Sequence, residues 1–274
     1  VEEYCSAIGS ANEGQALNSA QNAWLEINAQ WQRLELLHVG PATHNDSALK
    51  KRIYSFSSEQ DLSTCAVDQS VVLAFESESF SVGSRASNSR GLGAIGYLLF
   101  EESLTHTCPS QVIQTQNWNN QADIDKKSQR CAYAIALSLD VQEAAQTLLN
   151  AWSVNMGNYR QAFVNPLNFS GHISALSDAM FYIEAETKDR NVGVPIGIHG
   201  DCTFTACPEE VEAFYSQSSL ANIRQNLLGF QNVLNGGIGL GFDDLISSKG
   251  VASVMAGFES DINLALAILD SIDE

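Results

Sequence analysis

Three glycines carry the most suggestive spacing in this sequence. Gly91, Gly93 and Gly96 spell G-x-G-x-x-G inside RGLGAIGYLLFEESL, which begins at Arg90. Glycines at this spacing hold dinucleotide phosphates when a buried strand precedes the first of them and a helix opens at the third. The residues before Arg90, SFSVGSRASNS, are polar and contain no apolar run that would form such a strand. This context argues against a dinucleotide-binding loop.

The same stretch has the apolar pattern of a helix. Leu92, Ile95 and Leu99 recur at the three-to-four spacing of one buried helix face. A glycine inside a helix costs up to about 1 kcal/mol relative to alanine. Gly93 and Gly96 therefore need a reason, which is either close packing of another helix or the loss of side chains that once stood there.

A carboxylate and an imidazole stand three residues apart at Glu35 and His38. On a helix, this E-x-x-H pattern places both side chains on one face, as in carboxylate-bridged iron sites. A complete site of that kind needs a second E-x-x-H, and the sequence holds no second copy. The alternative is a polar pair near a helix end, with His38 at the negative end of the helix dipole. Iron or another divalent metal is thus a candidate cofactor for this pair.

Signatures of the common hydrolases are missing. The five histidines include no H-E-x-x-H pair for zinc, and no G-x-S-x-G marks a serine nucleophile. We therefore expect no catalytic residues and no peptidase activity.

Apolar residues recur every three or four positions through most of the chain, and no alternating β pattern competes with them. Gly40 and Pro41 should end the first long helix. The polar segment 105–121 lacks an apolar period and is typical of a linker. The expected fold is all-α, with two similar four-helix-bundle domains over residues 1–118 and 119–274. The predicted helices cover residues 16–39, 47–56, 67–78, 91–104, 122–155 and 172–187, a stretch around residue 226, and 251–272.

The chain is strongly acidic. It holds 32 Asp and Glu against 14 Lys and Arg, a formal net charge of −18. Such a surface repels a phosphate backbone, so we expect no nucleic-acid partner. No run of about 18 apolar residues is present, and we expect no transmembrane segment. The start at Val1 leaves open a removed signal segment or a membrane anchor upstream.

Six cysteines occur without C-x-x-C pairs or histidines at zinc-finger spacing. Disulfides in an oxidising compartment are the favoured interpretation, and buried free thiols are the alternative. Cys202 and Cys207 close a short loop rich in turn-forming residues and are the pair most expected to be bonded. A bond there favours a periplasmic or extracellular-facing protein.

Several segments resemble the imelysin-like proteins, a bacterial periplasmic family once classed as insulin-cleaving metallopeptidases. The family's signature, GxHxxE within GFHAIEYLLF, aligns with GLGAIGYLLF, so that its histidine falls on Gly93 and its glutamate on Gly96. Glycine offers no donor atom beyond its backbone, so both metal-binding side chains are absent. Further similar segments carry Trp24, Trp31, Glu35, Gly40 and Pro41, then Cys65, Asp68 and Gln69, then Glu212, Ser216 and Ser219.

Two carboxylates in these segments have alternative roles. Asp68 either faces the family's binding site or caps the helix that starts there. Glu212 either faces the same site or interacts with a helix dipole at a helix start.

The resemblance implies two similar helical bundles with a binding site between them. It also implies a binding protein of iron uptake or metal homeostasis, whose partner is a small ligand, a metal ion, or a periplasmic or outer-membrane iron-uptake protein. The alternatives are an interaction or structural protein with a decayed site, a metallopeptidase, and a ferritin-like iron-binding protein. A working site should be an open cleft with convergent polar groups, whereas a decayed one should be filled by apolar side chains. The candidate ligand-binding residues are Glu35, His38, Asp68, Arg90, Gly91, Gly93, Gly96, Glu212 and Ser216.

Overall fold

The computed structural model describes residues 1–272, whose regular secondary structure is helical: α-helices, short 3₁₀ helices and one π-helix. Within these residues, extended backbone pairs only in an isolated bridge between Ser57 and Gln60. The chain divides into two compact units. Unit 1 comprises residues 1–26 and 39–172, and unit 2 comprises residues 27–38 and the chain from residue 173 onward. The predicted all-α class is confirmed, while two similar four-helix bundles stay a prediction.

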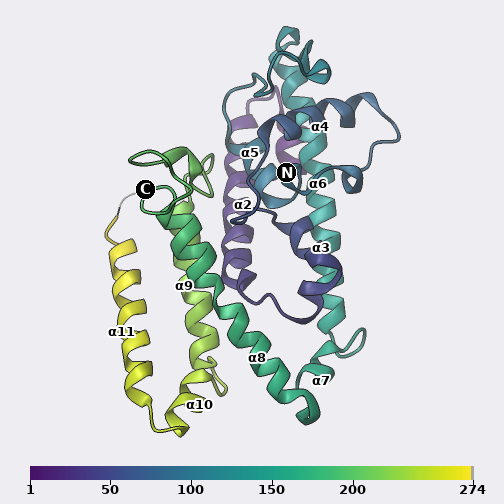
Figure 1. The fold of residues 1–274 in the computed structure, drawn as a ribbon. Coiled ribbons are helices and arrows are strands. Elements are labelled where there is room, and N and C mark those ends of the chain that lie inside the picture. Colours follow the sequence, from purple (N-terminus) through teal and green to yellow (C-terminus); the bar gives the residue numbers. More distant parts are fainter. Residues whose placement is uncertain (273–274) are drawn as a thin grey trace. The chain divides into compact units, whose positions relative to one another are not determined.

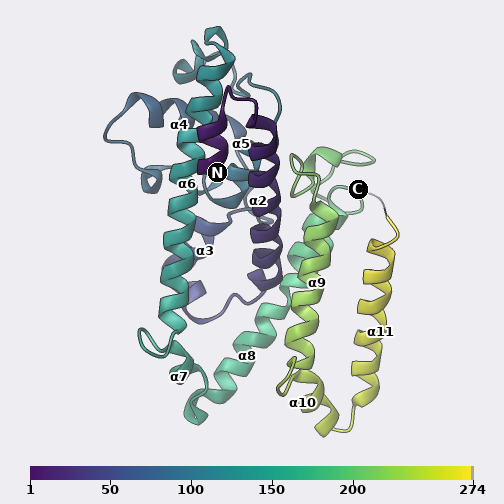
Figure 2. The same ribbon diagram turned by 180° about the vertical axis from the view of Figure 1, so that it is seen from behind.

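The longest helix of unit 1, α6 (Asp123–Trp152), packs against three others, α3, α4 and α5 (Figures 1 and 2). It also contacts the short α1 at the N-terminus. Short 3₁₀ turns join these elements. The other helices of this unit are α1 (Glu2–Ala7), the first part of α2 (Glu13–Glu35), α3 (His44–Ile53), α4 (Thr64–Glu76), α5 (Gly91–Phe100), α7 (Tyr159–Phe163) and the start of α8 (Phe169–Met180).

Two buried aromatic residues fix the start of α5. Trp24 of α2 is buried, and its indole N–H donates to the Leu92 carbonyl at 2.8 Å. Tyr133 of α6 is fully buried, and its hydroxyl donates to the Ser89 carbonyl at 2.8 Å. Each ring adds a large apolar area to the core while its polar tip keeps a hydrogen-bond partner. The segment from Ser89 to Leu92 is therefore held from two sides.

Unit 2 is arranged around α9 (Ser219–Asn235), which packs against a π-helix, η7 (Ile183–Gly193), and against α10 and α11. Both views show α9 and α11 side by side, joined through α10 (Figures 1 and 2). The remaining helices are the second part of α2, most of α8, α10 (Phe242–Ser248) and α11 (Ala252–Leu269). One cluster of its buried apolar core comprises Leu36, Phe230, Leu234, Met255 and Ile262.

Helix α11 carries more apolar side chains than the rest of unit 2 buries. Met255 and Ile262 are its buried residues, whereas Val254, Leu264 and Ile268 are exposed. With a mean hydropathy of 1.3, this helix is long enough and apolar enough to cross a membrane, judged by length and composition only. A helix that packs along one side has the same composition, so the expected lack of a transmembrane segment stays a prediction.

All six cysteines are paired, as Cys5–Cys131, Cys65–Cys108 and Cys202–Cys207. The predicted short-loop pair is confirmed. Disulfides persist in oxidising environments, so three of them indicate a location outside the cytoplasm.

The two units divide the chain differently from the predicted boundary after residue 118. The helix α6 was expected in the second bundle. It belongs to unit 1 because its buried face meets α3, α4 and α5 and because Cys131 is bonded to Cys5. The helix α2 also contributes to both units, which no linker pattern in the sequence indicates.

The first long helix ends earlier than predicted. Its last residue is Glu35, four residues before the expected end at residue 39. The backbone N–H groups of Leu37 and His38 donate to the carbonyls of Leu34 and Leu36, so the chain leaves the α-helical pattern there. Gly40 and Pro41 instead begin a 3₁₀ turn.

Candidate functional site

The glycine motif in α5 is a surface for close packing. A Cβ at Gly96 would lie 2.7 Å from the ring of Trp24, closer than real contacts allow. A Cβ at Gly93 would lie 3.7 Å from Cδ1 of Leu62, which is an ordinary contact distance. The Trp24 ring therefore fills the space beside Gly96, whereas Gly93 leaves room for a methyl group.

Arg90 and Gly91 shape the start of the same helix. Arg90 is the N-cap, and its Nη1 donates to the Val82 carbonyl at 3.5 Å. Its Nε is buried without a hydrogen-bond partner among residues 1–272. Gly91 has a φ of +71°, and a Cβ there would lie 2.6 Å from the Ile53 carbonyl oxygen. Gly91 is thus required by the backbone.

Asp68 is a buried carboxylate in α4. The Tyr97 hydroxyl donates to its Oδ1 at 3.1 Å, and Thr107 donates to its Oδ2 from the backbone N–H at 2.7 Å and from the hydroxyl at 2.9 Å. Burial raises the pKa of Asp68, and these hydrogen bonds oppose the rise. Ser63 is the N-cap of α4, with its hydroxyl accepting from the Ala66 N–H. The capping role predicted for Asp68 is therefore wrong, and the carboxylate instead anchors the loop after α5.

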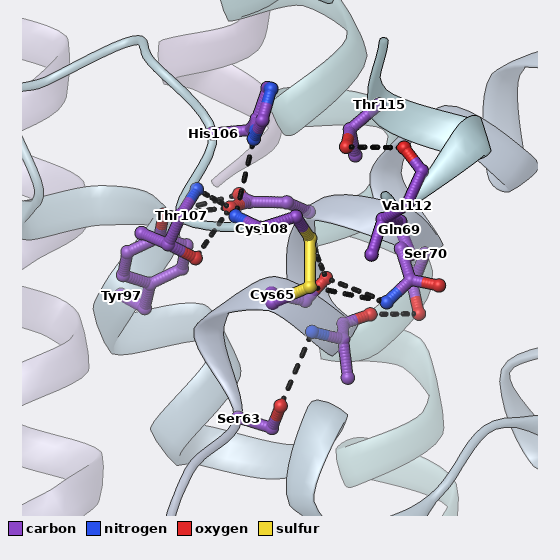
Figure 3. The surroundings of a disulfide bond; sticks show 12 residues. Ser63, Cys65, Gln69, Ser70, Tyr97, His106, Thr107, Cys108, Val112 and Thr115 are labelled. Carbon is purple, nitrogen blue, oxygen red and sulfur yellow. Dashed lines mark hydrogen bonds between the residues drawn. A yellow bond between two sulfur atoms is a disulfide. The ribbon is translucent and has the colours of Figure 1, made fainter. Parts of the chain in front are cut away.

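A disulfide holds the same loop (Figure 3). Cys65 lies one turn before Asp68 in α4, and its partner Cys108 follows Thr107 directly. His106 accepts a hydrogen bond at Nδ1 from the Cys108 N–H at 3.2 Å (Figure 3). The bond and the carboxylate together attach this segment to α4.

In unit 2, the π-helix η7 brings polar side chains into the interior. Thr187, Arg190 and Asn191 are all buried on it. Arg190 donates to the Glu210 carbonyl at 3.1 Å and pairs with the Glu210 carboxylate at 3.0 Å. Because π-helical geometry is rare and frequently marks functional sites, η7 is the first indication of a site in this unit.

Six buried side chains from α2, η7 and α9 form what we call the amide cluster. Asn28 donates to Asn222 Oδ1 at 2.8 Å. Asn226 donates to the carbonyl and the side-chain oxygen of Gln32 at 2.9 and 2.8 Å. Within the described part of the chain, three of the cluster's buried polar atoms have no hydrogen-bond partner: Asn28 Oδ1, Asn191 Oδ1 and Asn222 Nδ2. The members are Asn28, Gln32, Thr187, Asn191, Asn222 and Asn226.

Glu212 borders the amide cluster. Its Oε1 accepts from Gln32 at 2.7 Å, and its Oε2 accepts from Asn191 at 3.3 Å. It lies in a turn before α9, which begins at Ser219, so the predicted helix-start role is wrong. Glu212 therefore connects α2 to the π-helix.

The charges of Glu35 and Glu212 both act on Tyr182. Glu35 is the last residue of α2 and is only 3% exposed. Its carboxylate interacts with the Tyr182 hydroxyl. Burial first, and then the charges of Glu35, Glu212 and Glu186, raise the pKa of Tyr182 well above its usual value. The tyrosine accordingly stays protonated and remains a donor at physiological pH.

His38 and Ser216 lie outside regular helix. Because α2 ends at Glu35, the E-x-x-H pair does not occupy one helical turn, which corrects the predicted placement of His38. The Ser216 hydroxyl bonds the Ala213 carbonyl at 3.3 Å and the Ser218 hydroxyl at 2.8 Å. Ser216 thus stabilises the turn that leads into α9.

Comparison with known proteins identifies the family. The family model for imelysin matches residues 1–274, the entire sequence. This chain belongs to the imelysin family. The resemblance found in the sequence is thereby confirmed.

A solved structure supports the same fold. An imelysin-like protein from Psychrobacter arcticum 273-4 matches with a TM-score of 0.61 and 13% identity, over 99% of this chain and 74% of that one. At this identity the similarity shows the fold alone. No curated protein matches the sequence.

The metal motif of the imelysin family is incomplete in this chain. Gly93 and Gly96 stand where the family's histidine and glutamate fall, and neither has a side-chain donor. Within residues 1–272, no three His, Cys, Asp or Glu side chains gather to hold a metal ion. The residues of α5 therefore do not fit the metal that the family motif implies.

The nine predicted site residues of this imelysin-family chain are distributed over both units. Within unit 2, the charges of Glu35 and Glu212 both act on Tyr182, and a site between the units stays a prediction. Unit 1 holds Asp68, Arg90, Gly91, Gly93 and Gly96, and unit 2 holds Glu35, His38, Glu212 and Ser216.

Sequence reasoning missed the amide cluster, although a signal was present. Asn28 and Gln32 are four residues apart on α2, and Asn222 and Asn226 are four apart on α9. This spacing puts two amides on one helix face, which is unusual beside apolar neighbours. Asn191 had no such signal because nothing in the sequence indicates a π-helix.

Proposed function

We propose that this chain is a periplasmic or extracellular-facing binding protein of the iron-uptake setting, and that it does not hydrolyse peptides. Its ligand is a small polar molecule or a complexed metal, and its protein partner is a component of periplasmic or outer-membrane iron uptake. The amide cluster, with Glu35, Glu212 and Tyr182 beside it, receives the ligand.

The main support is the combination of a π-helix with buried amides whose hydrogen bonds are incomplete. A buried polar atom without a partner costs about 1–3 kcal/mol. Native proteins hold few such atoms, and three lie in this one cluster among the described residues. Amide groups that can donate and accept suit a polar ligand or an anionic metal chelate better than a bare cation, which prefers charged oxygens.

A second candidate function is an interaction or structural protein whose metal site has decayed. The observation that favours it is the ring of Trp24, which occupies the space beside Gly96. Under this candidate the amide cluster only fixes the register of α2 against α9, and neither small ligands nor metals bind.

Calorimetric titration separates the two candidates. The probes are ferric citrate, citrate alone, ferrous ion and zinc ion, preceded by elemental analysis of the purified protein. The test variant is Asn28→Leu with Asn222→Leu, which replaces both members of a hydrogen-bonded pair by side chains of similar size and should therefore preserve the fold. The matched control is Gln146→Leu with Asn150→Leu, an exposed amide pair on α6.

We expect ferric citrate to bind at about one equivalent, with at least about tenfold weaker binding in the test variant and unchanged binding in the control. Equal weakening in both variants, or no binding of any probe, would rule out the amide cluster and favour the second candidate. Cleavage of a peptide substrate that disappears in Glu35→Ala would overturn the non-peptidase assignment.

A further inference from the structure

A pocket in unit 1 has features of a second binding site. Its volume is about 320 Å³, within the range of small-molecule sites. It lies between α1, the N-terminal part of α2, the C-terminal end of α5, and α6. Leu17 and Leu99 supply apolar wall, and Tyr4 and Arg130 supply polar groups. None of these residues belongs to the glycine motif or to the amide cluster.

Arg130 is the deepest charge of this pocket. It is 5% exposed, and two of its nitrogens donate to the carbonyls of Ser103 at 2.8 Å and Tyr97 at 3.2 Å. Its Nε is buried without a hydrogen-bond partner, and no carboxylate of the described chain forms an ion pair with it. A buried arginine normally has such a carboxylate partner. The base of the pocket therefore holds a positive charge without a direct ion pair, which the Tyr97 ring at 5.2 Å and the more distant Asp68 carboxylate compensate only in part.

The other charges of the pocket are arranged differently. Lys127 is paired with Glu13, so these two residues largely neutralise one another. Glu101 is half-buried and Glu102 is exposed, so both carboxylates lie nearer to solvent than Arg130. The pocket is thus positive at its base and negative at its rim.

We propose that this pocket binds a zwitterionic amino acid with an apolar side chain. The ligand carboxylate lies at Arg130 with the Tyr4 hydroxyl beside it, and the ammonium group lies at Glu101 and Glu102. The apolar side chain packs against the leucine wall. An amino acid carries a carboxylate and an ammonium group on one carbon, which complement the positive base and the negative rim of the pocket. A dianion would be repelled by the carboxylates at the rim.

The test is calorimetric titration of the full chain with L-leucine, isocaproate and isoamylamine. These ligands share one hydrocarbon body but carry both charged groups, the carboxylate alone, or the ammonium alone. A hydrogen bond to a charged group is worth a factor of about ten or more in affinity. We expect L-leucine to bind at one equivalent and each single-charge analogue to bind at least about tenfold more weakly.

Two tryptophan variants localise the binding without removing the structural contacts of Arg130. Leu17→Trp fills the pocket from its apolar wall, and Leu139→Trp, on the exposed side of α6, is the matched control. Binding should disappear in Leu17→Trp and persist in Leu139→Trp. The exposed Glu102→Gln should weaken L-leucine and leave isocaproate unchanged. Absence of L-leucine binding, equal affinity for isocaproate, or retention in Leu17→Trp would each overturn the proposal.

Discussion

At the scale of single residues, Asp68 shows how burial and hydrogen bonding compete. Burial favours its protonated form, while the donors on Tyr97 and Thr107 favour the carboxylate, and the net result is a raised pKa. A carboxyl group that binds its proton more tightly when folded stabilises the fold below its usual pKa. This contribution is lost as the pH rises through the raised pKa.

We therefore predict that the stability advantage of the wild type over Asp68→Asn shrinks as pH rises through that window. The asparagine variant serves as the reference because it has no titrating group at this position. Urea unfolding at a series of pH values measures the difference, and NMR titration of the carboxyl carbon locates the pKa directly. Thr107→Val removes one donor to the carboxylate and should raise the pKa of Asp68 further. A wild-type advantage that instead grows with pH would contradict the assignment.

At the scale of the helix, α5 holds two glycines in different surroundings. Gly93 has room for a methyl group and stands inside a helix, so Gly93→Ala should raise the free energy of unfolding by about 0.5–1 kcal/mol. Gly96 has the Trp24 ring in that space, so Gly96→Ala should lower it by about 1–3 kcal/mol through overpacking. Chemical denaturation of the two single variants measures both changes.

A second pair of variants tests the packing around Gly93 and Gly96 by introducing the histidine and the glutamate of the imelysin motif. Gly93→His should fold, because its nearest neighbour is the flexible end of Leu62. Gly96→Glu should fold poorly, because the glutamate would have to displace a buried indole that is hydrogen-bonded to Leu92. If Gly96→Glu is as stable as the wild type, the packing account of this glycine is wrong. Circular dichroism melting curves decide between the outcomes.

The sequence indicated helices well where apolar residues kept a steady period. The stretches that became α4, α5 and α6 are examples, since α4 and α6 each bury part of their surface and α5 is buried almost all round. The end of α2 and the π-helix η7 were not predictable, since both depend on backbone hydrogen bonds chosen by tertiary packing.

The candidate site was predictable to a smaller extent. Glu35 and Glu212 were recognised as candidates, and the charges of both raise the pKa of Tyr182. The amides around them carry no charge and match no motif, so their role emerged only when α2 and α9 were packed together. Asp68 was identified as important, but its partner Thr107 lies 39 residues later and no local pattern connects them.

At the scale of the whole molecule, net charge opposes compactness. The formal charge of −18 makes like charges repel across the folded surface. Surface ion pairs such as Lys51–Asp46 offset little of this destabilisation, because each exposed pair contributes about 0–1 kcal/mol to stability. We predict that the melting temperature rises when sodium chloride increases from about 10 mM to about 150 mM. At the higher concentration, repulsion between exposed charges more than about 8 Å apart is largely screened. Calorimetric scans should show this rise, and a falling melting temperature would mean that specific ion pairs outweigh the repulsion.

The disulfides act on the unfolded chain at the same scale. The residues of Cys5–Cys131 are 126 positions apart in the sequence, and those of Cys202–Cys207 are 5 apart. Removing the first bond therefore increases the conformational entropy of the unfolded chain more than removing the second. In the chain-entropy model the losses are about 5 and about 2 kcal/mol. We predict that the double variant Cys5→Ala with Cys131→Ala melts at a clearly lower temperature than Cys202→Ala with Cys207→Ala. Equal melting temperatures would mean that the packing around each bond, and not the length of the closed loop, sets its contribution.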